Sequence, residues 1–354
     1  MKKTTILTAF LLSFTVGSGL LVTNVAQAAP LALSGLVTNA GNYSVSQLKN
    51  LGSTTENVTV GSVTDSYTGV SLWTLLGGTA SGASSVIPGA GKNSILRDYV
   101  LATNSSGSQS LISLGEINPF FGGTGAPYLV AYEKNGNPLP VPQLIVPQDI
   151  SGSRNLAGLT SLQVLSSSPP SGGPGGPSDR FTLSGDVNSP GTYNLSRLKG
   201  PPFQPSILTG VTFVAGGKPT PPTDYTGVPI WTLLLDAGLS LHDVLTSYLL
   251  ATGTDGYEVL LSLAELNPAF GARPDLIAYA DSAHSDASLG DAGFARLILP
   301  GDNRGGRFVS NLSELRVVNA VPTPGTFILL LPMLVVLFWS RKPYTLKVKL
   351  LHRP

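Results

Sequence analysis

The feature that most constrains the fold of this chain is an internal duplication. Four sequence blocks occur twice in the same order, at offsets of 150, 158, 149 and 149 residues. The paired blocks begin at Leu33 and Leu183, at Tyr67 and Tyr225, at Tyr99 and Tyr248, and at Ser113 and Ser262. Because chance does not preserve the order of four matches, they indicate two copies of one domain with loops of different length.

The copies are separated by a segment rich in Ser, Pro and Gly. Residues 166–177 hold no apolar side chain that could join a core, so the segment is typical of a linker. We therefore expect a first domain over residues 30–165, a linker over 166–179 and a second domain over 180–319. On this interpretation the domains are tethered rather than fused.

The N-terminus has the layout of a secretory signal peptide. Lys2 and Lys3 precede a short apolar run, and an Ala-x-Ala site at Ala26 and Ala28 follows it. We expect cleavage after Ala28, which would remove residues 1–28 and export the protein. An uncleaved membrane anchor is the alternative.

The C-terminus carries a second targeting pattern over residues 321–342. The motif residues are Val321, Pro322, Pro324 and Gly325, followed by an apolar run over 327–339 and then by Arg341 and Lys342. This layout resembles the PEP-CTERM sorting signal of Gram-negative bacteria, in which a hydrophobic helix lies between a V-P-x-P motif and a basic cluster. Thr323 replaces the Glu that is usual in that family, and the chain continues beyond the point where such signals stop.

The resemblance implies an exosortase-like protease that removes the tail and releases the protein to the surface or to extracellular polysaccharide. Residues 343–354 form a basic tail without acidic residues, which should stay in the cytoplasm while the domains lie outside. The protein would then be held at first in the inner membrane. A plain C-terminal anchor and a buried core helix are the alternatives.

Composition excludes several classes of function. Charged residues make up 12% of the chain and the net charge is +1, so the sequence lacks the basic face of a nucleic-acid-binding protein. There is no cysteine, which removes disulfides, thiolate nucleophiles and every Cys-based metal site.

Local patterns predict a strand-rich domain with a few short helices. In the second copy, residues 248–252 and 257–261 read as two strands around a turn. Ser262 and Glu265 have the spacing of a capping box, and residues 229–237 read as another helix. We therefore expect an α+β fold in which β dominates, followed by a C-terminal hydrophobic helix.

Three stretches of the second copy carry a family resemblance. They are Tyr-Thr-Gly-Val-Pro-Ile-Trp-Thr-Leu-Leu at 225–234, Asp-Gly-Tyr-Glu-Val at 255–259 with Ser-Leu-Ala-Glu-Leu at 262–266, and Leu-Pro-Gly-Asp-Asn-Arg-Gly-Gly-Arg-Phe-Val at 299–309. Together they resemble the molybdopterin-binding oxidoreductase domain, which has the sulfite-oxidase fold. The resemblance covers about residues 183–318. The first copy matches more weakly and keeps one of the two loop arginines, Arg154.

In that family a cysteine thiolate ligates molybdenum. Here Val214, within Val-Thr-Phe-Val-Ala-Gly-Gly at 211–217, occupies the corresponding position, and residues 58–62 are its counterpart in the first copy. Neither stretch has a thiol, and valine has no lone pair to offer a metal. We therefore expect no metal and no cofactor, with molybdopterin as the alternative.

The Gly-rich loop supplies the candidate binding residues, which are Gly301, Arg304, Gly305, Gly306 and Arg307. A flexible backbone with two arginines suits an anionic or phosphate-bearing group, and the resemblance places this loop near a pterin. The alternative is a surface turn whose arginines are solvated or paired with Asp302 or Glu314.

Other polar groups give weaker signals. Asp281, His284, Asp286 and Asp291 share one loop that could bind a cation, but their spacing fits no EF-hand, and a solvated hairpin tip is the favoured alternative. Trp73 and Trp231 recur at the same position of each copy, which is typical of core residues. No G-x-S-x-G motif lies near His242 or His284, so a hydrolase has no support.

These observations predict an exported surface or matrix protein that uses an enzyme-like fold for non-catalytic binding or for structure. Two linked domains favour avidity. The alternative is a molybdopterin-dependent oxidoreductase of the sulfite oxidase superfamily. The expected partners are an exosortase-like protease, extracellular polysaccharide or other envelope components, and the membrane through the C-terminal segment. Nucleic acid is not expected.

Overall fold

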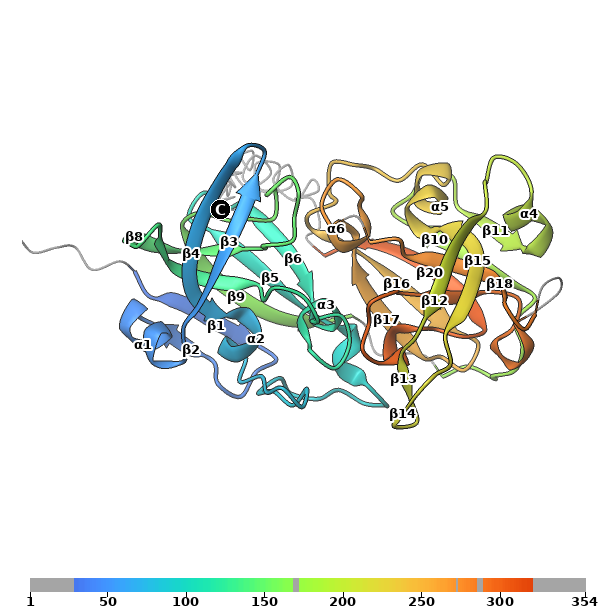
Figure 1. The fold of residues 1–354 in the computed structure, drawn as a ribbon, viewed down its shortest axis with the longest axis horizontal. Coiled ribbons are helices and arrows are strands. Elements are labelled where there is room, and N and C mark those ends of the chain that lie inside the picture. The colour runs from blue at the N-terminus through green and yellow to red at the C-terminus, as the bar shows by residue number, and fades with distance from the viewer. Residues whose placement is uncertain (1–28, 168–171, 272, 285–288, 321–354) are drawn as a thin grey trace, which may run out of the picture.

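A computed structural model describes residues 29–167, 172–271, 273–284 and 289–320 (Figure 1). The expected signal peptide, with its cleavage site at Ala26 and Ala28, lies outside the described residues. The same holds for the sorting motif from Val321 to Gly325, for the C-terminal hydrophobic helix and for Asp286.

The first half contains two β-sheets. The five-stranded sheet has the order β2-β1-β9-β5-β6 and consists of β1 (Leu31–Gly35), β2 (Gly41–Tyr43), β5 (Asp98–Asn104), β6 (Gln109–Ser113) and β9 (Leu159–Ser166). The four-stranded sheet has the order β3-β4-β7-β8 and consists of β3 (Thr54–Val60), β4 (Val63–Ser71), β7 (Leu129–Lys134) and β8 (Asn137–Ile145). Strands β1 and β9 run parallel, and all the other neighbours are antiparallel.

The second half repeats this topology and adds a hairpin. Its five-stranded sheet has the order β11-β10-β20-β16-β17, from β10 (Arg180–Gly185), β11 (Gly191–Asn194), β16 (Ser247–Gly253), β17 (Glu258–Ser262) and β20 (Leu312–Asn319). Its four-stranded sheet has the order β12-β15-β18-β19, from β12 (Ser206–Val211), β15 (Thr223–Pro229), β18 (Leu276–Asp281) and β19 (Arg296–Ile298). The added hairpin pairs β13 (Val214–Ala215) with β14 (Lys218–Pro219).

The helices are short and lie at the ends of strands. The α-helices are α1 (Val45–Asn50), α2 (Leu72–Leu75), α3 (Leu114–Ile117), α4 (Leu195–Lys199), α5 (Ile230–Asp236) and α6 (Leu263–Leu266). The 3-10 helices are η1 (Ser94–Arg97), η2 (Gly290–Ala292) and η3 (Gly305–Arg307). Within the described part of the chain, every helix is too short or too polar to cross a membrane.

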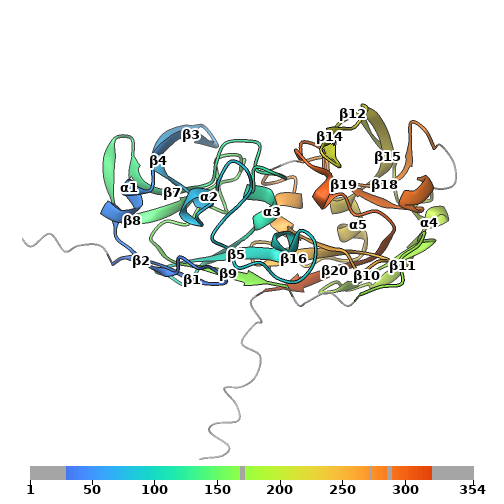
Figure 2. The same cartoon turned by 90° about the horizontal axis from the view of Figure 1, so that it is seen from below.

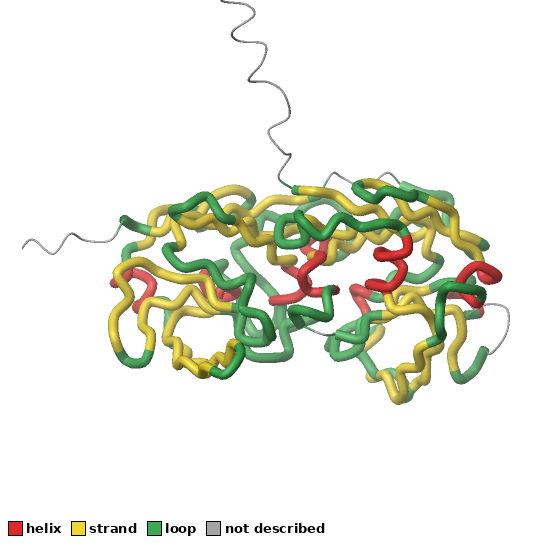
Figure 3. Tube along the Cα trace, turned by 90° about the horizontal axis from the view of Figure 1, so that it is seen from above, coloured by secondary structure: helices red, strands yellow, loops and turns green. Residues whose placement is uncertain are grey.

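The α+β class expected from the sequence is wrong. Strands make up 43% of the described residues and helices 14%, and the four larger sheets have a propeller-like arrangement of four blades. Figure 3 shows helices as isolated turns between strands rather than as a layer. The capping box at Ser262 does start a helix, as its counterpart at Ser113 does, but each helix ends after one turn. The cause is the following Asn-Pro pair, since Asn118 and Asn267 are extended before proline.

The two sheets of each half pack face to face around a hydrophobic core. Strand β5 is buried on both faces, because Val100 and Ala102 point into the core of the first half while Tyr99 and Leu101 point the other way. These outward side chains join Tyr248 and other residues of the second half in a separate cluster. Because successive side chains of a strand point to opposite faces, β5 contributes to two different hydrophobic cores.

The two halves are packed against one another rather than merely tethered. Figure 2 shows the two five-stranded sheets side by side in one layer, and Tyr99 contacts Tyr248 with ring centroids 5.5 Å apart. These tyrosines occupy equivalent positions of the two copies. The contact thus has the self-complementary character of a two-fold interface.

Serine and glutamate side chains repeat this symmetry. Ser113 Oγ donates to Glu265 across the interface over 3.1 Å, and Ser262 Oγ donates to Glu116 over 3.2 Å. Each serine caps the helix of its own half and also bonds the glutamate of the other half. All four side chains are buried, so the bonds are shielded from competition by water.

Candidate functional site

A cleft between the two halves contains the strongest candidates for binding. Its volume is about 630 Å³, within the range typical of small-molecule sites. We call it the central cleft and define it by Lys92, Phe120, Phe213, Tyr257, Arg296, Arg304 and Phe308. Because Lys92 and Phe120 belong to the first half and the others to the second, neither half forms this cleft alone.

One wall of the central cleft is an insertion in the second half. A turn of two residues, 61–62, joins β3 to β4, whereas residues 212–222 join β12 to β15. The insertion forms the β13–β14 hairpin, and the Val214 backbone N–H donates to the Asn303 carbonyl over 2.9 Å. The hairpin therefore folds back on the Gly-rich loop and places Phe213 in the cleft.

Another part of the wall comes from a loop that is longer in the first half. Residues 76–97 include this loop, and the repeat offset falls from 158 to 149 residues across it. The Asn93 side-chain amide donates to the Tyr257 hydroxyl over 3.0 Å, and that hydroxyl donates to the Gly306 carbonyl over 2.6 Å. The two places where the copies differ most in length therefore meet at one cleft.

Two arginines of the central cleft stack on aromatic rings. Arg304 Cζ lies 3.8 Å from the centroid of Phe120, and Arg296 Cζ lies 5.5 Å from that of Phe213 and 5.8 Å from that of Phe308. Within the described residues, neither guanidinium has a carboxylate at ion-pair distance. The described groups also leave the buried Arg296 Nε without a hydrogen-bond partner. Burial lowers the pKa of Arg296 from its ordinary value. Unused donors on a desolvated guanidinium suit an anionic group.

The structure divides the predicted Gly-rich loop between the central cleft and the interior. Arg304, Gly305 and Gly306 line the cleft, while Gly301 lines an adjoining hollow beside Val214. Gly301 has a φ of +90°, in the region that favours glycine. Of the five predicted residues, Arg304 is the one that presents a charge to the cleft.

Packing explains why residues 305 and 306 are glycines. A β-carbon on Gly305 would lie 2.6 Å from the Phe213 ring, and one on Gly306 would lie 2.3 Å from the Phe121 ring. Any other residue would have to displace these phenylalanines. The two glycines therefore shape the wall of the cleft and need no direct contact with a ligand.

Arg307 points into the interior. Its fully buried guanidinium donates to Asp302 through Nε and Nη2, over 2.7 Å in each case, and to Glu265 through Nη1 over 2.9 Å. These contacts favour the alternative stated for this loop, in which an arginine pairs with Asp302. In the first half, Arg154 is buried in the same way between Asp149 and Glu116.

Carboxyl groups outnumber arginines in the buried network at the interface. Its acidic members are Glu116, Asp149, Glu265, Asp275 and Asp302, and its basic members are Arg154, Arg273 and Arg307. Asp275 is 4% exposed, and both of its carboxylate oxygens lack a hydrogen-bond partner among the described groups. Desolvation raises the pKa of Asp275 to about 7, and burial also raises the pKa of Glu265.

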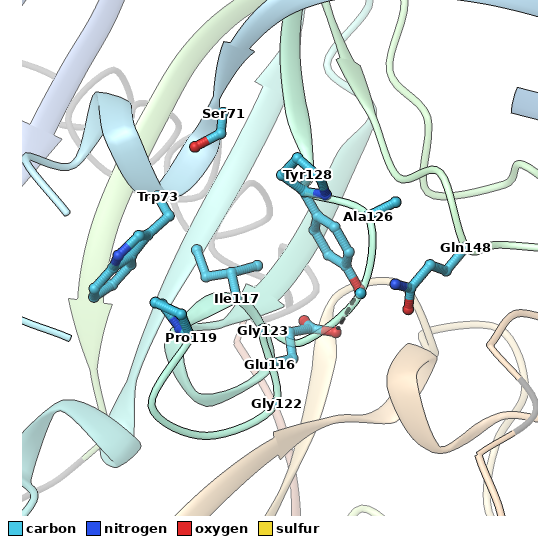
Figure 4. A pocket seen from close by; sticks show the side chains of 12 residues that line it. Ser71, Trp73, Glu116, Ile117, Pro119, Gly122, Gly123, Ala126, Tyr128 and Gln148 are labelled. Atoms are coloured by element: carbon cyan, nitrogen blue, oxygen red, sulfur yellow. Dashed lines mark hydrogen bonds between the residues drawn. The ribbon is translucent and has the colours of Figure 1, made fainter. Parts of the chain in front are cut away.

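A smaller pocket of about 160 Å³ lies in the first half. Figure 4 shows Tyr128 and Gln148 directed toward Glu116, and the Tyr128 hydroxyl donates to Glu116 over 3.1 Å. Glu116 is already paired with Arg154. We therefore place this pocket with the buried network and not with the candidate binding groups.

The remaining candidates are scattered. His284 Nδ1 lies 2.9 Å from Asp281 Oδ1, and Asp291 is exposed. Within the described residues, no group of three or more His, Asp or Glu is placed to hold a metal. Trp73 is buried and Trp231 packs against the core of the second half, while His242 is exposed.

The residues of the central cleft do not fit the molybdenum of the resembling family. Val214, at the position of the thiolate ligand, lines the cleft next to Phe213 and Ala215. These side chains have no lone pair, and the chain has no cysteine to replace them. The thiolate that the resemblance implies as the metal ligand therefore has no counterpart in the cleft.

Comparison with known proteins finds a weak likeness among solved structures and nothing among families or curated proteins. No protein-family model matches the chain, and no curated protein does. Among solved structures, the sulfane dehydrogenase SoxCD from Paracoccus pantotrophus is 20% identical over 39% of this chain and 37% of that chain, with a TM-score of 0.30. The chain thus spans little more than a third of the length of that protein. So weak a likeness says nothing about chemistry, which depends on the residues of a site.

Proposed function

We propose that this chain is an exported binding protein that holds an anionic ligand in the central cleft and performs no molybdenum chemistry. The observation that carries the proposal is the pair Arg296 and Arg304, two guanidiniums on aromatic rings that have no carboxylate at ion-pair distance among the described residues. The charge of Asp281 acts on Arg296 from beyond that distance. Lys92 adds a third positive charge, and Asp255 is the one acidic residue among the described residues that line the cleft. An excess of positive charge in a partly desolvated cleft attracts anions.

We propose a non-catalytic role because the metal ligand implied by the family resemblance has no counterpart in the cleft. The resembling family needs a thiolate at the position of Val214, and valine cannot replace it. This leaves a molybdopterin-dependent oxidoreductase as the less favoured function. Association with envelope polysaccharide, expected from the C-terminal motif, would place the protein near its ligand but need not involve the central cleft.

Replacing Arg296 or Arg304 by methionine should weaken the binding of inorganic phosphate by about tenfold or more, the value of one charge-assisted hydrogen bond. Methionine keeps an unbranched side chain and removes the charge. Binding can be followed by ³¹P NMR titration of the purified protein. Arg180→Met is the matched control, because Arg180 is exposed and paired with Asp179.

Two results would contradict the proposed function. One is phosphate binding that is equal in all three variants and in the unaltered protein. The other is stoichiometric molybdenum or extractable pterin in the purified protein, since the redox alternative would then hold.

Removal of residues 321–354 should change where the protein accumulates. If this segment holds the protein in the inner membrane until it is processed, the truncated protein will appear in the soluble exported fraction without a membrane-bound precursor. Fractionation and immunoblotting measure this distribution. Truncation of only the basic tail, residues 343–354, is the control, and an unchanged distribution after the longer truncation would rule out the sorting role.

A further inference from the structure

We infer that the ligand of the central cleft carries a flat apolar ring beside its anionic group; this inference rests on the proposed function and names the chemical class of the ligand. The cleft contains a ring surface and an uncompensated cation in the same place. Neither feature alone would select such a molecule.

The aromatic side chains come from separate parts of the chain. Phe213 lies on the inserted hairpin and Phe308 follows the Gly-rich loop, and their ring centroids are 4.4 Å apart at an interplanar angle of 52°. Phe120 comes from the first half and is half-buried under the Arg304 guanidinium. Phe213 and Phe308 are only 8% and 5% exposed, so the half-buried Phe120 is the most accessible of the three rings and offers the main surface on which a planar group can stack.

Size argues against a bare anion. A volume of about 630 Å³ falls in the range of pockets that enclose molecules of drug size. A phosphate or acetate ion would interact with the positive charges of the cleft and leave the rings uncovered. A larger anion can bury the rings as well and so gain hydrophobic stabilisation.

Hydrogen bonding argues against a polyhydroxylated ligand. The Asn93 amide and the Tyr257 hydroxyl bond to each other and to Gly306, and Asp255 accepts from the Tyr257 backbone N–H. Asn311 bonds to the Asp291 carbonyl. With these side chains engaged, the described lining leaves the Ser310 hydroxyl, the second oxygen of Asp255, the positive charges and the ring surface for a ligand. A sugar acid would find few partners for its hydroxyl groups.

The test is a series of anions titrated by calorimetry into the full-length protein. The probes are acetate, glucuronate, benzoate and 2-naphthoate, which carry one carboxylate each and differ in the attached group. We expect 2-naphthoate to bind at least about tenfold more tightly than acetate, because of the ring area that it buries, and glucuronate to bind no better than acetate.

Two variants of the central cleft test which side chains bind the ring and which bind the carboxylate of the probe. Phe120→Leu should weaken 2-naphthoate by about fivefold more than it weakens acetate, through the loss of stacking, whereas Arg304→Met should weaken both to a similar extent. Phe120 is only half-buried, so this variant is expected to fold. Intermolecular NOEs between 2-naphthoate and the Phe120 and Phe213 rings supply a readout that is independent of affinity.

The outcomes separate this inference from the proposed function. One outcome is that both arginine variants bind acetate less tightly, while the unaltered protein binds 2-naphthoate no more tightly than acetate. The anion site is then supported and the inference of a ring on the ligand is wrong. If glucuronate binds best, the ligand is a sugar acid and the inference is equally wrong. If 2-naphthoate binds equally to Arg296→Met, Arg304→Met and the unaltered protein, both claims fail, because binding is then independent of the cleft charge.

Discussion

Replacement of Arg307 by methionine is expected to lower the free energy of unfolding by about 3–5 kcal/mol, the range for breaking a buried ion pair from one side. The side chains of Asp302 and Glu265 are 0% and 4% exposed. Without Arg307, Glu265 loses its cation, while Asp302 keeps a bond from Arg273 over 2.8 Å. The stranded charge of Glu265 should therefore dominate the loss.

Arg304→Met is the matched control, because it makes the same substitution three residues away in the same loop. Arg304 contributes a cation–π contact with Phe120, so its loss should cost no more than about 1 kcal/mol of stability while it weakens anion binding by about tenfold or more. Urea denaturation measures both variants. If Arg307→Met does not accumulate as folded protein, the double variant with Glu265→Gln removes the stranded carboxylate and should recover part of the loss. Equal and small effects of the two single variants would contradict the structural role of Arg307.

Much of the local structure could be predicted from the sequence, because it depends on neighbouring residues. The strands around residues 253–256 form as β16 and β17, and the capping box of Ser262 and Glu265 is present. The fold class was wrong because a capping box marks where a helix begins and not how far it runs. Pro119 and Pro268 end these helices, and these residues were visible in the sequence.

The different roles of Arg304 and Arg307 could not be predicted from the sequence, because they depend on tertiary contacts. Arg304 and Arg307 look equivalent in a Gly-rich loop, but the carboxylates that bury Arg307 come from the same loop and from α6. Sequence reasoning also missed Arg296 and Phe213 as candidate binding residues. One signal could have found Phe213: the repeat offset changes between residues 183 and 225, which marks the inserted segment. No comparable signal exists for Arg296, which lies in β19.

The duplication also explains where the central cleft lies. Both copies keep the buried arginine, the two carboxylates beside it and the capping serine, which together form the interface. The copies differ in the loop after α2 and in the link before β15, and both of these segments line the cleft. The interface residues are thus the same in both copies, whereas the loops beside the interface differ. Loops on a rigid scaffold are where binding sites commonly form, so the differing loops can build a site to which both halves contribute.

The stability of the protein is expected to fall by about 2–3 kcal/mol between pH 5 and pH 8 through Asp275 alone. Desolvation raises the pKa of Asp275 to about 7 from its ordinary 3.8, with the nearby carboxylates of Glu265 and Asp302 adding to the shift and the guanidiniums of Arg273 and Arg307 opposing it. A carboxyl whose pKa is higher in the folded state binds its proton more tightly there. Its stabilising effect is therefore complete below pH 3.8 and is lost as the pH rises through about 7.

Asp275→Asn tests this directly, because asparagine has the shape of the protonated acid and cannot ionise. The variant should be more stable than the unaltered protein at pH 8, by an amount that shrinks toward pH 5, in urea denaturation measured at half-unit steps. Desolvation also raises the pKa of Asp98, to about 6, so part of the slope will remain. Asp291→Asn, on an exposed turn, is the control and should keep the full slope. Curves for Asp275→Asn and the unaltered protein that run parallel from pH 5 to pH 8 would show that Asp275 ionises freely. The buried network at the interface would then have to accommodate all five negative charges against three arginines.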